Sequence, residues 1–301
     1  MKTSLTAETL RQAGGGPPLV MVTAYDVMSA HLAETAGVDL ILVGDSAGMV
    51  MLGYEDTSAI TMQEMLLFCR AVARGAQHTM LIGDLPAHSY ESDDTLAVAN
   101  AERLVREGGM HAVKLEGAGA MLPRVRAVTA AGIPVMGHLG LLPQSVHSPG
   151  GYRAQARTAS EAQALLDDAQ ALEEAGAVAV VLEAIPPEVA AAATDLLTIP
   201  TIGIGAGPLT DGQVLVWHDL LGITPAPHPR FVRQYANLAS EITDALSGYA
   251  SDVRARAFPA VEHEYRMAEV EKEAFERILR ERGHPLGPTS PQSGNEEHRT
   301  R

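Results

Sequence analysis

The sequence predicts a protein of the α/β class, a (β/α)8 TIM barrel, and three observations support this fold. A helical stretch, a glycine-containing stop, a short apolar run and a polar residue follow one another repeatedly along the 301 residues. The stop glycines suit the left-handed backbone that ends a helix. The near-continuous apolar runs suit parallel strands buried on both faces. Eight such runs within about 250 residues match a TIM barrel, with a doubly wound open sheet as the alternative.

The eight predicted strands cover residues 19–23, 40–43, 80–82, 112–115, 133–136, 178–182, 201–204 and 214–217. Two of the intervening helices begin with a capping box, formed by Thr61 with Glu64 and by Thr158 with Glu161. The single cysteine, Cys69, lies on the apolar stripe of the first of these helices. This position predicts a buried core thiol rather than a nucleophile.

The strand pattern stops before Phe231, and the remaining sequence predicts helix followed by a tail. We expect a catalytic barrel domain over residues 1–263, a C-terminal amphipathic helix over 264–284 and a disordered tail over 285–301. The apolar side of the C-terminal helix is formed by Met267, Val270, Ala274 and Ile278. Such a side indicates packing on the body of the protein or on a neighbouring subunit.

The charge composition argues against several classes of function. The chain has 22 Lys and Arg against 37 Asp and Glu, a formal net charge of −15, and it has no basic cluster. This acidity argues against nucleic acids and anionic membranes as partners. One cysteine indicates a reducing compartment, and no apolar run approaches the ~20 residues that span a bilayer. We therefore expect a cytoplasmic protein.

Five polar residues stand at five successive strand ends, namely Asp45, Asp84, Glu116, His138 and Glu183. In a TIM barrel these ends form the C-terminal mouth, where catalytic residues lie. One acidic residue after a strand is most simply the N-cap of the next helix, and one histidine is most simply a core residue. Five such residues at consecutive ends favour an active site.

A divalent cation is the simplest way to keep these acids together. Asp45, Asp84 and Glu116 would repel one another unless a cation or protons offset their charge. Mg²⁺ takes oxygen ligands and uses one or two protein carboxylates directly, and the sequence has no His/Cys cluster with zinc spacing. Lys114 shares a strand face with Glu116, two residues further on. Glu183, set among apolar residues, is a candidate general base.

Two glycine-containing segments allow more than one interpretation. The segment Gly203-Ile204-Gly205-Ala206-Gly207 lacks the third glycine position of the dinucleotide fingerprint. It would act either as a phosphate loop after the seventh strand or, as we favour, as glycine that admits close approach of a ligand or strand. The segment Gly150-Gly151-Tyr152-Arg153 could contact a substrate, although a surface loop is its default interpretation.

Nine motifs occur in a characteristic order between about residues 23 and 265. They are Thr23-Ala24-Tyr25-Asp26, Val43-Gly44-Asp45-Ser46, Gly83-Asp84-Leu85-Pro86, Lys114-Leu115-Glu116-Gly117, Gly137-His138-Leu139-Gly140-Leu141, Pro143-Gln144-Ser145, Leu182-Glu183-Ala184-Ile185-Pro186, Gly203-Ile204-Gly205-Ala206-Gly207, and Thr210-Asp211-Gly212-Gln213 followed by His218-Asp219. Together they resemble the ketopantoate hydroxymethyltransferase (3-methyl-2-oxobutanoate hydroxymethyltransferase) family of the phosphoenolpyruvate mutase/isocitrate lyase superfamily.

The resemblance implies a reaction and its cofactors. 5,10-Methylenetetrahydrofolate, a co-substrate, would donate a hydroxymethyl group to 3-methyl-2-oxobutanoate, giving 2-dehydropantoate for pantothenate biosynthesis. The implied chemistry passes through an enolate stabilised by Mg²⁺. The resemblance also implies a homo-oligomer, which is a decamer in the family.

The resemblance further assigns a role to each matching residue. Glu183 would be the catalytic base. The metal would be held by Asp45 and Asp84 directly and by Glu116 directly or through water. The residues implied to bind or face the substrate are Asp45, Ser46, Asp84, Lys114 and His138, with Ser46 and Lys114 holding the oxoacid carboxylate.

Three departures from the family pattern lie outside these residues. Ala87 stands where phenylalanine is usual, Ala156 stands where glycine is usual, and residues 225–229 replace a glycine-rich approach. They leave open a paralogue that forms or cleaves a carbon–carbon bond in another 2-oxoacid without folate. A barrel that has lost catalysis and serves as a binding or assembly subunit is a further alternative.

Overall fold

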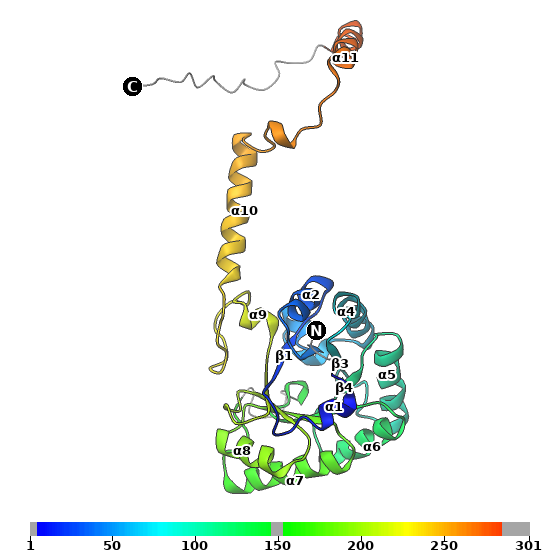
Figure 1. Cartoon of the computed structure of the whole chain (residues 1–301), viewed down its shortest axis with the longest axis vertical. Helices are drawn as coiled ribbons and strands as arrows, with labels where there is room; N and C mark the ends of the chain where they lie inside the picture. The colour runs from blue at the N-terminus through cyan, green and yellow to red at the C-terminus, as the bar shows by residue number, and fades with distance from the viewer. Residues whose placement is uncertain (1–4, 146–152, 285–301) are drawn as a thin grey trace, which may run out of the picture. The chain divides into compact units, whose positions relative to one another are not determined.

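A computed structural model describes residues 5–145 and 153–284 of the chain, and within them lies a closed barrel of eight parallel strands (Figure 1). The strands are β1 (Leu19–Thr23), β2 (Leu40–Val43), β3 (Met80–Asp84), β4 (Ala112–Lys114), β5 (Val135–Gly140), β6 (Ala179–Glu183), β7 (Thr201–Ile204) and β8 (Gly212–Leu215). Each strand pairs with the next along the chain, and β8 pairs with β1. The predicted (β/α)8 barrel is confirmed. The loop segment predicted at residues 150–152 and the tail at 285–301 lie outside the described residues.

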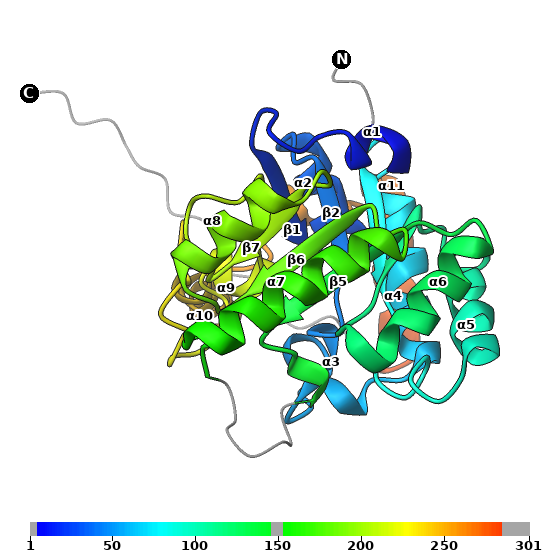
Figure 2. The same ribbon diagram turned by 90° about the horizontal axis from the view of Figure 1, so that it is seen from below.

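The helices that connect the strands lie outside the barrel (Figure 2). They are α2 (Val27–Thr35), α3 (Ala47–Val50), α4 (Met62–Gly75), α5 (Asp94–Arg106), α6 (Leu122–Ala130), α7 (Ala159–Glu174) and α8 (Pro187–Leu196), with α1 (Ala7–Arg11) before β1 and α9 (Trp217–Leu220) after β8. Three short 3-10 turns, η1 (Thr57–Ala59), η2 (Gly119–Met121) and η3 (Pro143–Ser145), complete the loops. Both predicted capping boxes are present, at the starts of α4 and α7.

Alternate residues of the strands build two separate apolar layers. Leu40 and Leu42 of β2 point into the barrel and join an inner cluster with residues such as Met80 and Ile82. Ile41 and Val43 of the same strand join the outer cluster, between the strands and the helices. Because both faces of each strand are covered, the sequence runs are almost continuously apolar. The inner layer fills the interior of the barrel with apolar side chains. Polar side chains can therefore gather only at the two ends of the barrel.

Cys69 of α4 belongs to the outer apolar layer, as predicted. Its side chain is fully buried, and burial raises the pKa of the Cys69 thiol well above its ordinary range. The thiol is therefore a core group without nucleophilic character at neutral pH.

Several details of the predicted barrel were wrong. The fifth strand runs over Val135–Gly140 instead of residues 133–136. The eighth strand ends at Leu215, and Trp217 begins α9 instead of ending the strand. The helix expected between the last two strands is absent, because residues 205–211 connect β7 directly to β8. A connection of this length is too short to contain the helix and the two turns that the other strand-to-strand connections have.

The glycine-rich segment after β7 supports close approach rather than a phosphate loop. A Cβ added at Gly203 would lie 2.7 Å from Thr210 Oγ1, and one added at Gly205 would lie 2.6 Å from the Phe231 ring. A Cβ at Gly207 would lie 2.6 Å from Pro187. These glycines let neighbouring parts of the chain pack against the backbone.

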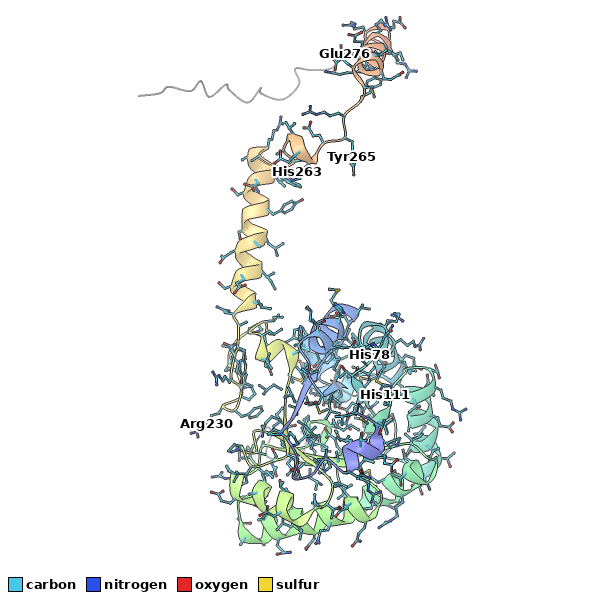
Figure 3. The ribbon with its side chains drawn as sticks, in the orientation of Figure 1. His78, His111, Arg230, His263, Tyr265 and Glu276 are labelled. Atoms are coloured by element: carbon cyan, nitrogen blue, oxygen red, sulfur yellow. The ribbon has the colours of Figure 1, made fainter. Side chains whose placement is uncertain are left out.

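Among the described residues, those from 241 to 284 belong to a second compact unit, and those up to residue 240 belong to the barrel unit. The division falls inside the segment 1–263 that the sequence assigns to the barrel. Helix α10 (Leu238–Ala255) begins just before this division. The next elements along the chain are η4 (Val261–His263) and α11 (Glu269–Glu281). Tyr265 lies, exposed, on the segment between η4 and α11 (Figure 3). Among the described residues, no helix has the length and apolarity needed to cross a membrane.

The end of β5 requires glycine, which gives a test of the packing. Gly140 has φ +95°, and an added Cβ would lie 2.2 Å from the Glu183 carbonyl oxygen. We expect Gly140→Ala to lower the free energy of unfolding by about 3–5 kcal/mol. Alanine is strained at a positive φ, and its Cβ would also clash with the Glu183 carbonyl oxygen. Urea unfolding measures this difference. Gly37→Ala is the control: its φ is +80° but its Cβ meets nothing within 4 Å, so about 1–2 kcal/mol is expected. If both variants lost the same free energy of unfolding, the proposed clash at Gly140 would be contradicted.

Candidate active site

The ends of β2 to β6 bring the five predicted polar residues to one end of the barrel. Asp84 and Glu183 are the last residues of β3 and β6, His138 lies within β5, and Asp45 and Glu116 follow β2 and β4 by two residues. Since parallel strands end together, their terminal side chains share the mouth. The Asp45 backbone N–H donates a hydrogen bond of 3.3 Å to Asp84 Oδ2, which sets these two residues side by side.

Lys114 is the cationic centre of the group. Its Nζ lies 2.9 Å from Asp84 Oδ2 and 3.9 Å from Glu116 Oε1. Burial by itself would favour the neutral amine, but the surrounding carboxylates of Asp84, Glu116 and Asp45 outweigh it and raise the pKa of Lys114. Lys114 therefore stays charged although its side chain is almost completely buried.

His138 connects two carboxylates on opposite sides of its ring. Nδ1 lies 3.3 Å from Glu116 Oε1, and Nε2 lies 3.3 Å from Glu183 Oε2. Burial and the nearby Lys114 ammonium favour the neutral ring, but the two carboxylates prevail and raise the pKa of His138 to about 9. At neutral pH the imidazole is thus a second buried cation.

Asp45 and Asp84 are the acids of the mouth whose charged form burial disfavours most. Burial raises the pKa of the Asp45 carboxyl well above its ordinary value, and the charges of Asp84 and Glu116 raise it further. Burial also raises the pKa of Asp84, although Lys114 opposes this. Asp84 Oδ1 is buried and has no hydrogen-bond partner among the described residues. An additional positive charge beside these two oxygen donors would relieve both effects.

These features fit a hard divalent cation held by few protein ligands. No group of three or more His, Cys, Asp or Glu side chains in the described part of the chain forms a complete metal cage. Mg²⁺ does not need one, because it retains several waters and binds one or two carboxylates. Asp45 and Asp84 are the best-fitting pair. Glu116 already faces two cations, Lys114 and His138. Burial raises the pKa of the Glu116 carboxyl, but the contact with His138 outweighs this effect, so the pKa is lowered.

Glu183 differs from the other acids by its exposure and its backbone. Its side chain is 14% exposed, compared with 1% for Asp84 and 3% for Glu116, so it is the more accessible acid. The next residue, Ala184, has φ +49°, in the left-handed region that alanine avoids. Its carbonyl accepts a hydrogen bond of 2.9 Å from the N–H of Gln155, next to Ala156 with φ +54°. Strained backbone on both sides of this contact is typical of a functional site.

Ser46 lies at the same end of the barrel, beside Asp45. It is half-buried, and its Oγ lies 2.8 Å from the hydroxyl of Tyr25. Tyr25 is fully buried in the outer layer, and burial raises the pKa of its hydroxyl far above the neutral range. The pair therefore presents neutral hydroxyl groups.

Sequence reasoning gave no role to two residues that connect the site. The Gln144 side-chain amide donates to Asp45 Oδ2 at 2.9 Å, and its backbone N–H donates to Glu116 Oε2 at 3.1 Å. The Tyr90 hydroxyl donates to Gln144 Oε1 at 2.7 Å. Gln144 lies in one of the matched motifs, which was the available signal, whereas Tyr90 lies in none.

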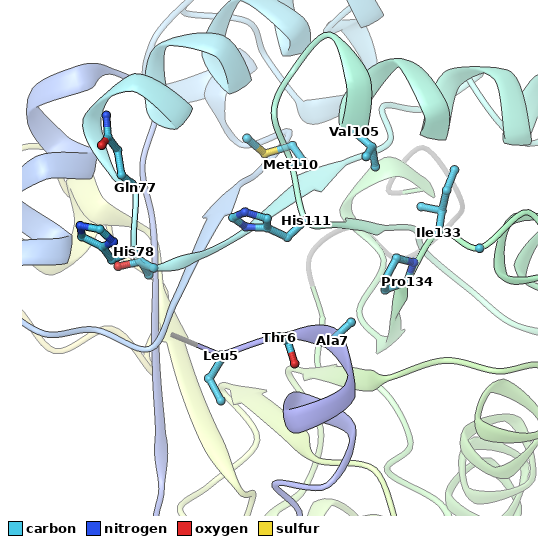
Figure 4. A pocket seen from close by; sticks show the side chains of 12 residues that line it. Leu5, Thr6, Ala7, Gln77, His78, Val105, Met110, His111, Ile133 and Pro134 are labelled. Atoms are coloured by element: carbon cyan, nitrogen blue, oxygen red, sulfur yellow. The ribbon is translucent and has the colours of Figure 1, made fainter. Parts of the chain in front are cut away.

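Two cavities in the described residues lie away from these acids. The larger, about 510 Å³, lies at the amino ends of β3 to β5, with Leu5, Thr6 and Ala7 on one side and His78, Met110 and His111 on the other (Figure 4). The second, about 390 Å³, lies after the carboxyl end of β3 and is lined by Ala87, Ser89 and Arg103 among others. Only the second borders the loop that follows Asp84.

The barrel and its mouth define a class of protein, a TIM barrel that gathers buried carboxylates, a lysine and a histidine at the carboxyl ends of its strands. Comparison with known families is more specific. The model of the family described as ketopantoate hydroxymethyltransferase matches residues 4–261. The chain belongs to this family, a family of transferases.

Curated relatives agree over most of the chain, and each is named 3-methyl-2-oxobutanoate hydroxymethyltransferase. The protein of Nitratidesulfovibrio vulgaris is 53% identical over 285 residues, 95% of this chain and 93% of the relative. That of Geobacillus kaustophilus is 51% identical over 87% of this chain and 93% of the relative. That of Emericella nidulans is 46% identical over 92% of this chain and 80% of the relative.

Solved structures with a similar fold belong to other enzymes. A 2,3-dimethylmalate lyase of the PEP mutase/isocitrate lyase superfamily superposes with a TM-score of 0.56 at 18% identity, covering 93% of this chain and 99% of that one. A phosphoenolpyruvate phosphomutase from Streptomyces platensis gives 0.56 at 17% identity, covering 92% and 99%. At these identities the likeness concerns the fold.

The raised pKa of His138 predicts a pH-dependent stability of the metal-free protein. An unfolded histidine has a pKa near 6.5. Because the folded value is about 9, the stabilisation is fully present below pH 6.5 and is lost as the pH rises through 9. Relative to His138→Gln, the wild-type free energy of unfolding should fall by about 3 kcal/mol across this window. Urea unfolding in EDTA measures it. His31→Gln, an exposed histidine, is the control and should parallel wild type. Parallel curves for His138→Gln and wild type would contradict the assignment.

Proposed function

We propose that the protein transfers a hydroxymethyl group from 5,10-methylenetetrahydrofolate to 3-methyl-2-oxobutanoate. The products are 2-dehydropantoate and tetrahydrofolate, in pantothenate biosynthesis. The names of the relatives support the reaction. The observation that carries the proposal is the separation of roles at the mouth: two buried aspartates with an unpartnered oxygen lie beside cationic Lys114, and accessible Glu183 lies across His138.

Asp45 and Asp84 would hold the divalent cation, with Glu116 beside it. When bound, Mg²⁺ would supply Lewis-acid stabilisation of negative charge on the keto oxygen of the oxoacid. Lys114 supplies a fixed positive charge at the same place, because its ammonium is 2.9 Å from Asp84. With the Ser46 hydroxyl it would hold the substrate carboxylate. Both donors thus orient the oxoacid before any proton moves.

Glu183 is proposed to remove the proton from C3 of the oxoacid. The accessible side of its carboxylate can face a substrate, while Oε2 lies 3.3 Å from His138 Nε2. Protonated His138 orients this carboxylate and connects it through Glu116 to the buried charges. The resulting carbon nucleophile would form a bond to the methylene carbon as its bonds to the two folate nitrogens break, and water would supply the hydroxyl group. The two nitrogens would take up the proton held by Glu183 and the second proton of the water.

The oxoacid specificity has a second candidate. The cavity of about 390 Å³ on the loop after β3 is lined by Ala87, where the family resemblance leads us to expect phenylalanine. This cavity lies away from the acids but borders the loop that follows Asp84, and the departure at Ala87 would fit a paralogue that acts on a different 2-oxoacid, with or without folate. Turnover of 3-methyl-2-oxobutanoate with and without methylenetetrahydrofolate distinguishes the two: folate-independent turnover of another oxoacid would replace the first function by the second.

We also propose a cytoplasmic homo-oligomer. The single, buried cysteine suits a reducing compartment. Helix α10 has an exposed apolar stripe, formed by Ile242, Leu246, Tyr249 and Val253. A stripe with this helical spacing suits packing against another protein surface.

Glu183→Gln tests the base. The amide cannot accept the proton, so exchange of the C3 hydrogen of 3-methyl-2-oxobutanoate for deuterium should fall at least ~100-fold. Proton NMR in D2O measures the exchange, and calorimetry should still detect Mg²⁺-dependent binding of the oxoacid. Glu188→Gln, an exposed glutamate of α8, makes the same change outside the site and should exchange at the wild-type rate. Wild-type exchange in Glu183→Gln would remove Glu183 from this role.

Sedimentation equilibrium tests the oligomer. The expected mass is a multiple of the 31.7 kDa chain, and Leu246→Glu should lower it by placing a charge in the apolar stripe. Ser247→Glu adds the same charge to the other side of α10 and should leave the mass unchanged. A wild-type chain that sediments as a monomer would refute the oligomer.

A further inference from the structure

Gln144 uses every hydrogen-bonding function of its side chain inside the site. It is buried in η3, the turn after β5. Its two amide hydrogens go to Asp45 Oδ2 and to the Leu85 carbonyl oxygen, both at 2.9 Å. Its Oε1 accepts from the Tyr90 hydroxyl at 2.7 Å. A buried amide with all of its partners has one orientation.

Gln144 and its partners join four consecutive strand ends. Asp45 follows β2, Leu85 follows β3 and Glu116, which accepts from the Gln144 backbone N–H, follows β4. Gln144 itself follows β5. One residue, through its side chain and its backbone N–H, thus fixes the spacing of the three strand ends that carry the acids, which otherwise repel one another.

Tyr90 determines which way the amide points. The Glu116 backbone N–H, which can only donate, gives its hydrogen to the Tyr90 hydroxyl at 3.2 Å. The single hydroxyl proton of Tyr90 therefore goes to Gln144 Oε1, and the amide nitrogen must face Asp45. A reversed amide would set Oε1 against two acceptors, Asp45 Oδ2 and the Leu85 carbonyl.

We propose that Gln144, oriented by Tyr90, is a positioning residue that fixes the Asp45 carboxylate for the divalent cation. Gln144 holds Oδ2 of Asp45, and Asp84 Oδ2 is held in the same way by Lys114 and by the Asp45 N–H. Each aspartate thus has one oxygen fixed by the protein, and Asp84 Oδ1 is buried without a hydrogen-bond partner among the described residues. This inference rests on the proposed metal-dependent function.

Gln144→Glu is the direct test. The change replaces the donor facing Asp45 by an acceptor of nearly the same shape, so Asp45 loses its orientation. Electron paramagnetic resonance of free Mn²⁺ measures metal binding in the presence of 3-methyl-2-oxobutanoate. We expect the dissociation constant to rise at least ~10-fold, as for other residues that orient metal ligands. The matched control is Gln163→Glu on the surface of α7, where the amide donates to Asp167 at 2.8 Å, and it should bind Mn²⁺ as wild type does.

The outcomes separate the two proposals. If the wild-type chain binds no Mn²⁺ with the oxoacid, the metal-dependent function fails and this inference fails with it. If wild type binds but Gln144→Glu binds equally well, the positioning role alone fails.

Tyr90→Phe keeps the test decisive if Gln144→Glu does not fold, as judged by circular dichroism. Loss of the hydroxyl leaves Gln144 Oε1 without its donor and loosens the amide, so Mn²⁺ affinity should fall severalfold while the Michaelis constant for the oxoacid at saturating metal changes little. An unchanged Mn²⁺ affinity in folded Tyr90→Phe would overturn the role of Tyr90 and Gln144.

Discussion

The structure depends on the burial of acidic side chains at one end of a closed barrel. Asp45, Asp84 and Glu116 are all buried, and Lys114 forms an ion pair of 2.9 Å with Asp84 among them. Taking these charges out of water is costly, and apolar residues of the same volume would stabilise the fold as well or better. Their presence is therefore best explained by the chemistry that the cluster supports. The barrel accommodates it because its apolar inner layer is complete below the mouth.

Within the cluster, burial and accessibility divide the work. The aspartates are enclosed and lack sufficient positive charge, a condition that favours cation binding. Glu183 is more exposed and ends β6, directly before the strained backbone of Ala184, which places it for contact with a substrate. His138 lies between the two regions, 3.3 Å from a carboxylate on each side. One residue thereby couples the aspartate side of the mouth to the proposed base.

The sequence predicted the barrel and its acidic strand ends because both follow from periodicity. Apolar runs buried on two faces have no polar alternation, so the polar residues that end them stand out, as with Asp84 and Glu183. Gln144 and Tyr90 could not be found in this way. They lie in loops, and their roles depend on hydrogen bonds to residues as far away as Asp45, 99 positions earlier than Gln144. The direct β7–β8 connection was also missed, because glycines that admit close packing and glycines that end a helix look alike in sequence.

The central claim is that a divalent cation binds between Asp45 and Asp84. Anomalous diffraction from crystals soaked with Mn²⁺ and 3-methyl-2-oxobutanoate locates the ion directly. A peak within about 2.5 Å of a carboxylate oxygen of both residues, with the oxoacid on its open side, is the predicted result. A peak elsewhere in the chain, with the two aspartates bound only to protein groups, would contradict the claim.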